Sequence, residues 1–176
     1  KMDIRADILS VDGENIVFNR KKEYYYYMLN KPRGYITTSK DDRGRKTVLE
    51  LISDTPVRVY PVGRLDKDSE GLLIFTNDGN FANQLTHPSH QVSKLYRVTV
   101  RPTVTEEQLI ALANGVYLDD GTKTQPAIVR VVTQEENRSV LEISIKEGKN
   151  RQVRRMCAAV GLEVARLRRN AIGPVK

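Results

Sequence analysis

Short segments with the period and length of β-strands recur along the chain. In each, apolar or aromatic residues alternate with polar ones or form an unbroken run, and turn-forming residues bound the segment. Because Pro61 cannot donate a hydrogen bond to a neighbouring strand, the strand that contains it should lie at an edge or end there. The pattern predicts strands at Tyr24–Asn30, Val57–Val62, Leu72–Thr76, Leu95–Val100, Ala127–Val132, Val140–Ile145 and Leu162–Leu167.

Other segments have the period of an amphipathic helix. Glu106–Asn114 is a predicted helix because Thr103 and Glu106 have the spacing of a capping box and Gly115 follows the segment. Asn150–Val160 is another, since four residues spaced three and four apart form one apolar stripe: Val153, Met156, Cys157 and Val160. Shorter helical segments are predicted at Val48–Ile52 and Asn80–Leu85.

These elements divide the chain into two parts. Residues 1–22 have a turn at Asp12-Gly13 between short apolar stretches, which predicts a small hairpin or a linker. Residues 23–176 form the main domain. Because strands and helices do not alternate regularly in it, we expect an α+β domain with a mixed, mainly antiparallel sheet and flanking helices. The pattern stops abruptly at Gly173-Pro174, so we expect the last strands of the domain to lie beyond residue 176.

Composition excludes several classes of protein. With 39% hydrophobic and 29% charged residues, the chain can build a core and is neither disordered nor a membrane protein. No apolar run approaches the roughly 20 residues of a membrane helix, and the first ten residues lack a secretory signal. The single cysteine, Cys157, excludes an internal disulfide framework and a cysteine-based zinc site. We therefore expect a cytoplasmic protein.

The distribution of charge points to a polyanionic partner. The net charge is +7, and residues 147–170 hold seven basic and two acidic residues, a local balance of +5. Such a segment is typical of nucleic-acid binding, although a solvated basic face is the alternative. Within the predicted helix, Arg151, Arg154 and Arg155 lie on a face different from the apolar stripe. Their mutual repulsion favours phosphate or carboxylate groups as partners.

The densest polar cluster lies between two predicted strands, at residues 62–71. Loops between strands commonly present catalytic groups, so Asp66, Asp68 and Glu70 are candidates for catalysis or for holding a metal ion. An ordinary polar turn is the alternative. His87 and His90 could supply a general base but more often such residues close a helix, and Cys157 on the apolar stripe is expected to be a buried structural thiol.

Four segments in fixed order resemble RNA pseudouridine synthases of the ribosomal RsuA/RluB type. GRLDKDSEGLLIFTNDG (63–79) resembles the motif with the catalytic aspartate, and LNKPRGYITT (29–38) resembles the strand and turn before it. KLYRVTV (94–100) is similar to the motif with the active-site tyrosine, and EGKNRQVRRM (147–156) to the motif with a basic active-site residue. The resemblance covers residues 24–176 and implies the pseudouridine synthase fold.

The resemblance also implies an activity, a site and a partner. Asp66 would be the catalytic aspartate, Tyr96 the active-site tyrosine and Arg154 the basic residue beside Asp66, with Arg155 as the neighbouring alternative. No metal and no cofactor is implied. Residues 1–22 would be a linker or the remnant of an N-terminal RNA-binding domain, ahead of a catalytic domain at 23–176. The expected partner is ribosomal RNA, contacted by Lys31, Arg33, Arg43, Arg45, Arg64, Lys149, Arg151 and Arg155.

Two further expectations concern the target RNA and the oligomeric state, and two other functions stay open. Residues 39–52 look more like the branch acting on large-subunit (23S) than on small-subunit (16S) ribosomal RNA, and we expect a monomer. A non-catalytic RNA-binding or ribosome assembly module would need the basic face but not Asp66. A metal-dependent nuclease would use Asp66, Asp68 and Glu70 together.

Overall fold

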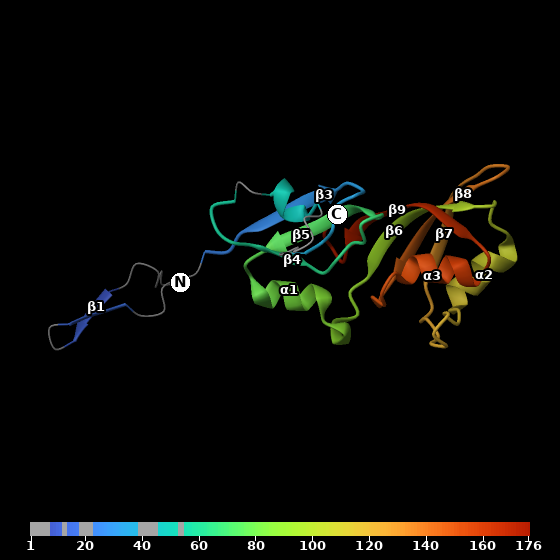
Figure 1. The fold of residues 1–176 in the computed structure, drawn as a ribbon. Coiled ribbons are helices and arrows are strands. Elements are labelled where there is room, and N and C mark those ends of the chain that lie inside the picture. The colour runs from blue at the N-terminus through green and yellow to red at the C-terminus, as the bar shows by residue number, and fades with distance from the viewer. Residues whose placement is uncertain (1–7, 12–13, 18–22, 39–45, 53–54) are drawn as a thin grey trace.

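The computed structural model describes residues 8–11, 14–17, 23–38, 46–52 and 55–176, and Figure 1 shows the chain as a ribbon. Strands β1 (Ile8–Val11) and β2 (Glu14–Val17) pair antiparallel in a two-stranded sheet, which confirms the hairpin expected near Asp12-Gly13. The predicted RNA contacts Arg43 and Arg45 lie outside the described residues.

The main domain contains, among the described residues, a sheet of seven strands. Every strand pair in it is antiparallel except β5 with β9, so the mixed, mainly antiparallel sheet is confirmed. Along the sheet the strands are β3 (Tyr26–Lys31), β5 (Glu70–Thr76), β9 (Glu163–Ile172), β6 (Lys94–Arg101), β8 (Ser139–Ile145) and β7 (Ile128–Gln134), and β4 (Tyr60–Val62) pairs with β5.

Strand β5 is where the two halves of the sheet meet. Its C-terminal part pairs with β4, and its first two residues, Glu70 and Gly71, pair with Arg168 and Arg169 of β9. Gly71 has a positive φ of 112°, and a Cβ on it would lie 2.2 Å from the backbone oxygen of Arg169. Only glycine therefore permits this junction.

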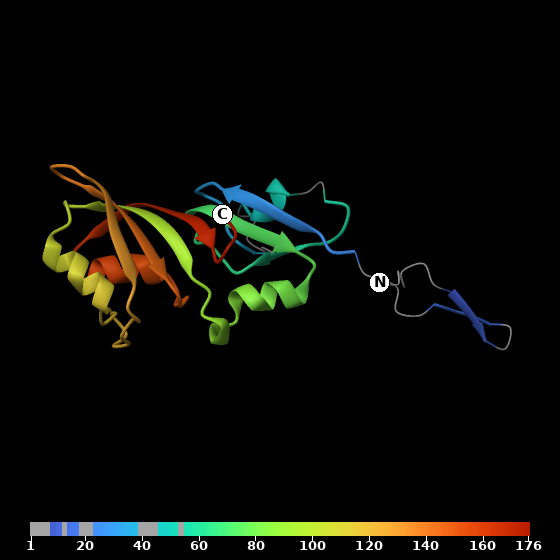
Figure 2. The same cartoon turned by 180° about the vertical axis from the view of Figure 1, so that it is seen from behind.

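Helices α1 (Gly79–Thr86), α2 (Glu106–Asn114) and α3 (Gln152–Ala159) lie on one side of the sheet, as Figures 1 and 2 show from opposite directions. Short 3₁₀ segments occupy Val48–Leu51 and Pro88–His90. None of the helices in the described part of the chain is long and apolar enough to cross a membrane.

Two large groups of apolar side chains form the core. One lies between α2, α3 and strands β6 to β9, where β8 buries every second residue, as a strand with one covered face must. The other joins β3 and β5 to the loops around Val48 and Leu65. Cys157 is fully buried in the first group, and burial raises the pKa of its thiol to about 12, which confirms a structural role.

Two predicted strand boundaries differ markedly from the observed ones. The last strand continues to Ile172 instead of ending at Leu167, because alternation persists through its arginines: Arg169 and Ala171 are buried. Only Tyr60–Val62 of the segment Val57–Val62 pairs, and it does so at an edge, as Pro61 predicted. The other strands and helices lie within a few residues of the predicted ranges.

The capping box of α2 was assigned to the wrong residues. Thr105, not Thr103, accepts a hydrogen bond from the backbone N–H of Gln108, and the Gln108 side chain accepts one from the Thr105 backbone. Thr103 instead donates its hydroxyl proton to the Glu135 carbonyl. The pattern Thr-x-x-Gln satisfies the capping rule as well as Thr-x-x-Glu does, so sequence spacing alone did not separate the two.

Candidate active site

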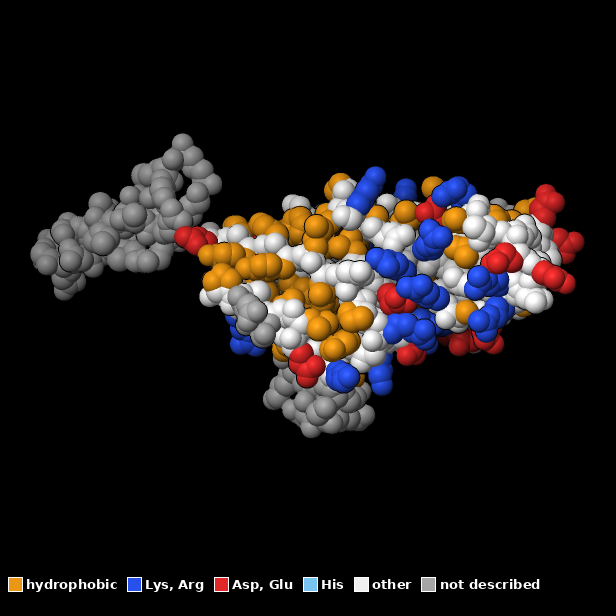
Figure 3. Space-filling model, turned by 90° about the horizontal axis from the view of Figure 1, so that it is seen from above, with side chains coloured by type: hydrophobic (Ala, Val, Ile, Leu, Met, Phe, Trp, Pro, Cys, Tyr) orange, Lys and Arg blue, Asp and Glu red, His pale blue; other side chains and the backbone are white. Residues whose placement is uncertain are grey.

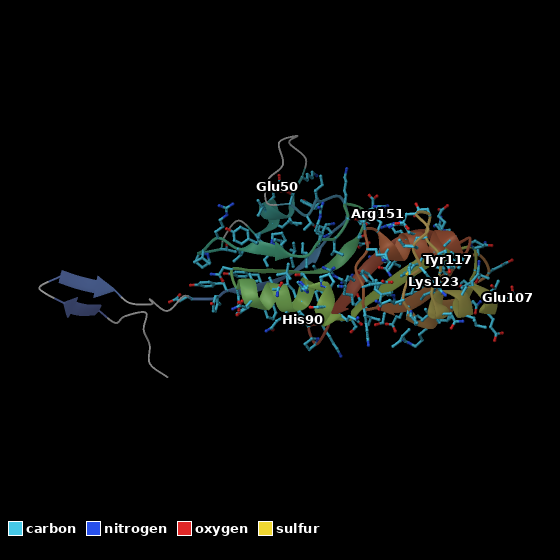
Figure 4. The ribbon with its side chains drawn as sticks, turned by 90° about the horizontal axis from the view of Figure 1, so that it is seen from below. Glu50, His90, Glu107, Tyr117, Lys123 and Arg151 are labelled. Atoms are coloured by element: carbon cyan, nitrogen blue, oxygen red, sulfur yellow. The ribbon has the colours of Figure 1, made fainter. Side chains whose placement is uncertain are left out.

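The loop between β4 and β5 carries Asp66 into a cleft of about 740 Å³. The cleft lies on the helix-bearing side of the molecule, where Figure 4 labels Arg151. Its wall is completed by the segment after α1, the start of β6 and the loop before α3. The residues that line it include Arg64, Asp66, Lys94, Tyr96, Lys149, Arg151 and Arg169.

The Asp66 loop is held by the last residue of β3, Lys31, and by Thr37 in the segment that follows the strand. Lys31 has no exposed surface, and its ammonium donates hydrogen bonds to the carbonyl oxygens of Ser69 at 2.8 Å and Pro32 at 3.0 Å. Thr37 both donates to the Leu65 carbonyl and accepts from the Leu65 N–H. These bonds fix both ends of the loop, so the position of Asp66 does not depend on a substrate.

Lys31 is therefore not an RNA contact, contrary to the sequence-based prediction. Its sequence neighbourhood, Lys-Pro-Arg-Gly, indicated an exposed turn, but the side chain turns inward and serves the backbone of the Asp66 loop. Burial lowers the pKa of Lys31 to about 8, while the charges of Asp66, Asp68 and Glu70 oppose that shift. A buried ammonium bonded to carbonyls is a structural support, not a phosphate ligand.

Two arginines from the start of α3 face Asp66. Nη1 of Arg151 lies 3.3 Å from Oδ2 of Asp66, and Nε of Arg154 lies 4.0 Å from the same oxygen. Both distances exceed the 2.7–2.9 Å of a short charge-assisted hydrogen bond. The Asp66 side chain is 33% exposed, so the carboxylate has cationic neighbours and still opens onto the cleft.

Arg154 is the more constrained of the two arginines. Its Nη2 donates to the Asp68 carbonyl and to the Ser69 hydroxyl, and its side chain is only 16% exposed. Its buried Nε has no hydrogen-bond partner among the residues that the structure describes. Burial and the nearby Arg151 lower the Arg154 pKa. An N–H group kept without a partner beside a carboxylate is costly, which is typical of a functional site.

Arg151 reaches Asp66 because the chain changes direction there. It lies just before α3 with a left-handed backbone, at φ 51° and ψ 36°, so it does not share a helix face with Arg154 and Arg155. Sequence spacing grouped the three arginines, and the structure separates them. Arg155 turns the other way and pairs with Asp119 at 2.8 Å and Asp120 at 2.9 Å. Of the two candidates, Arg154 is therefore the one beside Asp66.

Tyr96 enters the cleft from β6. It is half-buried, packs against the main core and lines the cleft, so one position makes it both a core residue and a residue of the site. Its partner in the β6–β9 register is Arg169. The tyrosine and Asp66 thus line one cleft although thirty residues separate them in sequence.

Arg169 was not predicted as a site residue. It is only 4% exposed, lines the cleft, and donates from Nε to the Leu72 carbonyl and from Nη1 to the Arg64 carbonyl. Its charge lies near that of the half-buried Lys94, and the partial burial of Lys94 and the charge of Arg169 both lower the Lys94 pKa. Strand alternation through Arg168-Arg169 was the signal that an arginine must point inward here.

The other predicted RNA contacts are distributed around the mouth of this cleft and beyond it. Arg33 and Arg64 are exposed, Arg64 and Arg151 line the cleft, and Lys149 lies 3.9 Å from Glu147. Arg155 already has two carboxylate partners. Cations with accessible charge therefore lie on the same side as Asp66.

The three acids of the loop do not converge on a metal position. No group of three potential ligands forms among the described residues, and both oxygens of Glu70 accept from Arg166 at 2.9 Å. His87 is the C-cap of α1, where its backbone N–H donates to the Asn83 carbonyl, which agrees with the alternative of a helix-closing histidine. Its ring accepts from the Ser89 N–H at the start of the 3₁₀ segment Pro88–His90.

Comparison with known proteins assigns the chain to a family. The model of the RNA pseudouridylate synthase family matches residues 25–159. The chain belongs to the RNA pseudouridine synthase family. Its relatives include ribosomal large subunit pseudouridine synthase B of Bacillus subtilis, 42% identical over 93% of this chain and 66% of that protein. An uncharacterized RNA pseudouridine synthase of Aquifex aeolicus is 43% identical over 100% of this chain and 70% of the relative.

Solved structures agree with this assignment to the pseudouridine synthases. A pseudouridylate synthase crystal structure superimposes with a TM-score of 0.77 at 31% identity, over 94% of this chain and 72% of that one. An H/ACA ribonucleoprotein bound to a substrate RNA shares the fold at 17% identity, with a TM-score of 0.61 over 85% of this chain and 48% of that one. The chain is thus a pseudouridine synthase of the RsuA/RluB type, and enzymes of this type are isomerases. It spans about two thirds of the length of these bacterial relatives.

Proposed function

We propose that this protein converts a uridine of large-subunit ribosomal RNA to pseudouridine, with Asp66 as the catalytic carboxylate. The observation that carries the proposal is the position of Asp66: on a loop fixed by Lys31 and Thr37, open to the cleft, and facing Arg151 and Arg154. Membership of the RNA pseudouridine synthases supports the reaction.

The reaction is an isomerisation in which the atoms of the substrate are conserved. The bond from ribose carbon 1 to uracil nitrogen 1 breaks, the base turns, and carbon 5 bonds to the same ribose carbon. Carbon 5 loses a proton and nitrogen 1 gains one, so no electron acceptor and no water is consumed. The step that needs help from the protein is breaking the glycosidic bond, because the base leaves with its bonding electrons.

Asp66 has three chemically reasonable routes in this step. Its carboxylate can add to carbon 6 of uracil, attack carbon 1 of the ribose, or remove a ribose proton to form a glycal. All three require an ionised carboxylate in contact with the nucleotide. Arg151 and Arg154 balance its negative charge without forming short bonds to it, which leaves its oxygens available.

The uridine must leave its stack in the RNA to reach Asp66, since the carboxylate lies inside a cleft. Tyr96 lines the same cleft and offers an aromatic face for the base and a hydroxyl group for proton transfer at carbon 5. Phosphates on either side of the uridine would contact the cations that line the cleft, Arg64, Lys149 and Arg151. The exposed Arg33 is a further candidate, because the backbone N–H of the next residue, Gly34, donates to the Lys67 carbonyl of the Asp66 loop.

The choice of large-subunit RNA rests on similarity. Two relatives, from Bacillus subtilis and Pseudomonas aeruginosa, are named as synthases of the large ribosomal subunit, and each matches more than nine tenths of this chain at 40% identity or above. A ribosomal substrate places the enzyme in the cytoplasm. Mapping pseudouridines in both ribosomal RNAs from cells with and without the protein tests the choice of large-subunit RNA. One pseudouridine of 23S RNA should be absent without the protein, and a loss confined to 16S RNA would refute the choice.

Tyr96→Phe tests the hydroxyl of the proposed stacking tyrosine. The variant should fold and bind RNA like the parent, because the ring remains, but it should form little finished pseudouridine. The measurement is the pseudouridine content of RNA after prolonged incubation, with RNA affinity measured in parallel. Full turnover by the variant would show that the hydroxyl has no essential part.

The salt dependence of RNA affinity tests the phosphate contacts. We expect log affinity to fall with log salt concentration with a slope that corresponds to several phosphates. Arg151→Ala should reduce that slope by about one contact. Arg155→Ala is the matched control from the same helix region, and because Asp119 and Asp120 already compensate its charge, it should change the slope less. Equal effects of the two variants would contradict the assignment.

A further inference from the structure

The side of the sheet turned away from the helices carries a second group of arginines. In Figure 3, which views the molecule from that side, lysine and arginine side chains gather over the half that holds β6, β8 and β9. They surround a shallow depression of about 590 Å³. Its lining, taken from the described residues, contains four arginines and no carboxylate: Arg97, Thr99, Arg138, Val140, Arg166, Arg168 and Asn170.

This depression and the active-site cleft lie on opposite faces of one sheet. Tyr96 and Arg169 are register partners and line the cleft, and Arg97 and Arg168 are the next partners along the same two strands. Because successive side chains of a strand point to opposite faces, a residue in the depression cannot also serve the cleft. The two basic surfaces therefore need separate explanations.

The central pair of the depression is unfavourable for folding. Arg97 and Arg168 lie directly opposite each other on adjacent strands, and like charges in that position destabilise a sheet. Neither has a carboxylate within 4.0 Å among the described residues, and Arg97 is exposed.

The acidic residues on this face are already engaged by other arginines. Glu70 of β5 forms two hydrogen bonds with Arg166, and Glu142 of β8, the register partner of Arg97, pairs with Arg130. Glu135 pairs with Arg138. Glu70 is also the register partner of Arg168, and the charge of Arg168 contributes to lowering the Glu70 pKa. Because neither Arg97 nor Arg168 forms an ion pair of its own within 4.0 Å among the described residues, both guanidinium groups can pair with an external anion.

We propose that this face, named here the back-face arginine surface (Arg97, Arg138, Arg166 and Arg168), binds the phosphate backbone of a second segment of folded RNA. The guanidinium fork matches phosphate oxygens, and Thr99 and Asn170 add neutral hydrogen-bonding groups to the depression. Since the surface faces away from Asp66, its RNA segment is remote from the target uridine. The inference rests on the proposed RNA substrate and extends it to a large, folded one.

Binding of a duplex RNA that contains only guanosine and cytidine tests the surface, because such a probe offers no uridine to the active site. The variant carries Arg97→Gln and Arg168→Gln together, which keeps a polar side chain at both positions and removes two positive charges. We expect its affinity to fall about tenfold at low salt, and the salt slope to decrease by about two phosphate contacts. The charge-matched control, Arg58→Gln with Lys123→Gln, changes two exposed cations outside both linings.

The outcomes separate this surface from the proposed catalysis. Asp66→Asn should bind the duplex like the parent protein, so the surface stands even if no pseudouridine is formed. An equal loss of duplex affinity in the Arg97/Arg168 variant and in the control would show that only the net charge matters, and would overturn the proposal. Wild-type affinity in the Arg97/Arg168 variant would overturn it as well. Binding of a poly-glutamate peptide as tightly as the duplex at the same salt would assign the surface to an acidic protein instead.

Discussion

Asp66→Asn should abolish pseudouridine formation, with a loss of at least about a thousandfold, and leave RNA binding intact. An amide is neither a nucleophile nor a base at neutral pH, so each of the three routes open to the carboxylate is lost. RNA binding persists because the phosphate contacts lie on other residues and one negative charge is removed. Release of tritium from RNA labelled at carbon 5 of uridine measures the reaction, since carbon 5 loses its hydrogen when the new bond forms.

The control for Asp66→Asn is Asp68→Asn, two residues along the same loop. The Asp68 side chain is exposed, and the loop uses its backbone carbonyl, which the amide variant retains. A surface aspartate tolerates the change within about 0.5 kcal/mol, and we expect activity close to that of the parent. Tritium release by Asp66→Asn at the parent rate would make the protein an RNA-binding module with a different use for this loop.

Lys31→Met should weaken both stability and catalysis, because the support beneath the Asp66 loop is lost. The Ser69 and Pro32 carbonyls would lose their donor, and a buried acceptor left without a partner costs about 1–3 kcal/mol. Chemical denaturation gives the change in unfolding free energy, and tritium release gives the change in rate. Lys67→Met, an exposed lysine of the same loop, is the matched control and should change neither measurably.

The pH dependence of the Lys31→Met effect has a defined sign. In the folded protein, burial lowers the pKa of Lys31 to about 8 from its ordinary value of 10.5. Below pH 8 the folded state carries the full cost of a buried ammonium. Between pH 8 and 10.5 the unfolded state binds more protons than the folded one, so the parent gains stability as pH rises. The variant should lack this gain, and parallel curves for parent and variant across that range would contradict the assignment.

Periodicity in the sequence determined most of the secondary structure, because it reports which face of each element must be buried. The alternation in β8 and the apolar stripe of α3 gave those elements their positions. The same reasoning was wrong for the end of β9, where a run of arginines hid a continuing alternation, and for the capping box at Thr105, where two equivalent patterns lay two residues apart.

By itself the sequence determined the fold class, the family and the importance of the Asp66 loop, since each depends on local patterns or ordered motifs. Only the tertiary structure decided which cations face Asp66 and which serve elsewhere. The left-handed backbone of Arg151 brings its side chain near the Asp66 carboxylate. Arg155 instead pairs with Asp119 and Asp120, and the buried Lys31 supports the Asp66 loop. The sequence shows how many arginines and lysines a segment contains, but not which groups their long side chains contact. Those groups are distant in sequence, and only the packing of the folded chain brings them within reach.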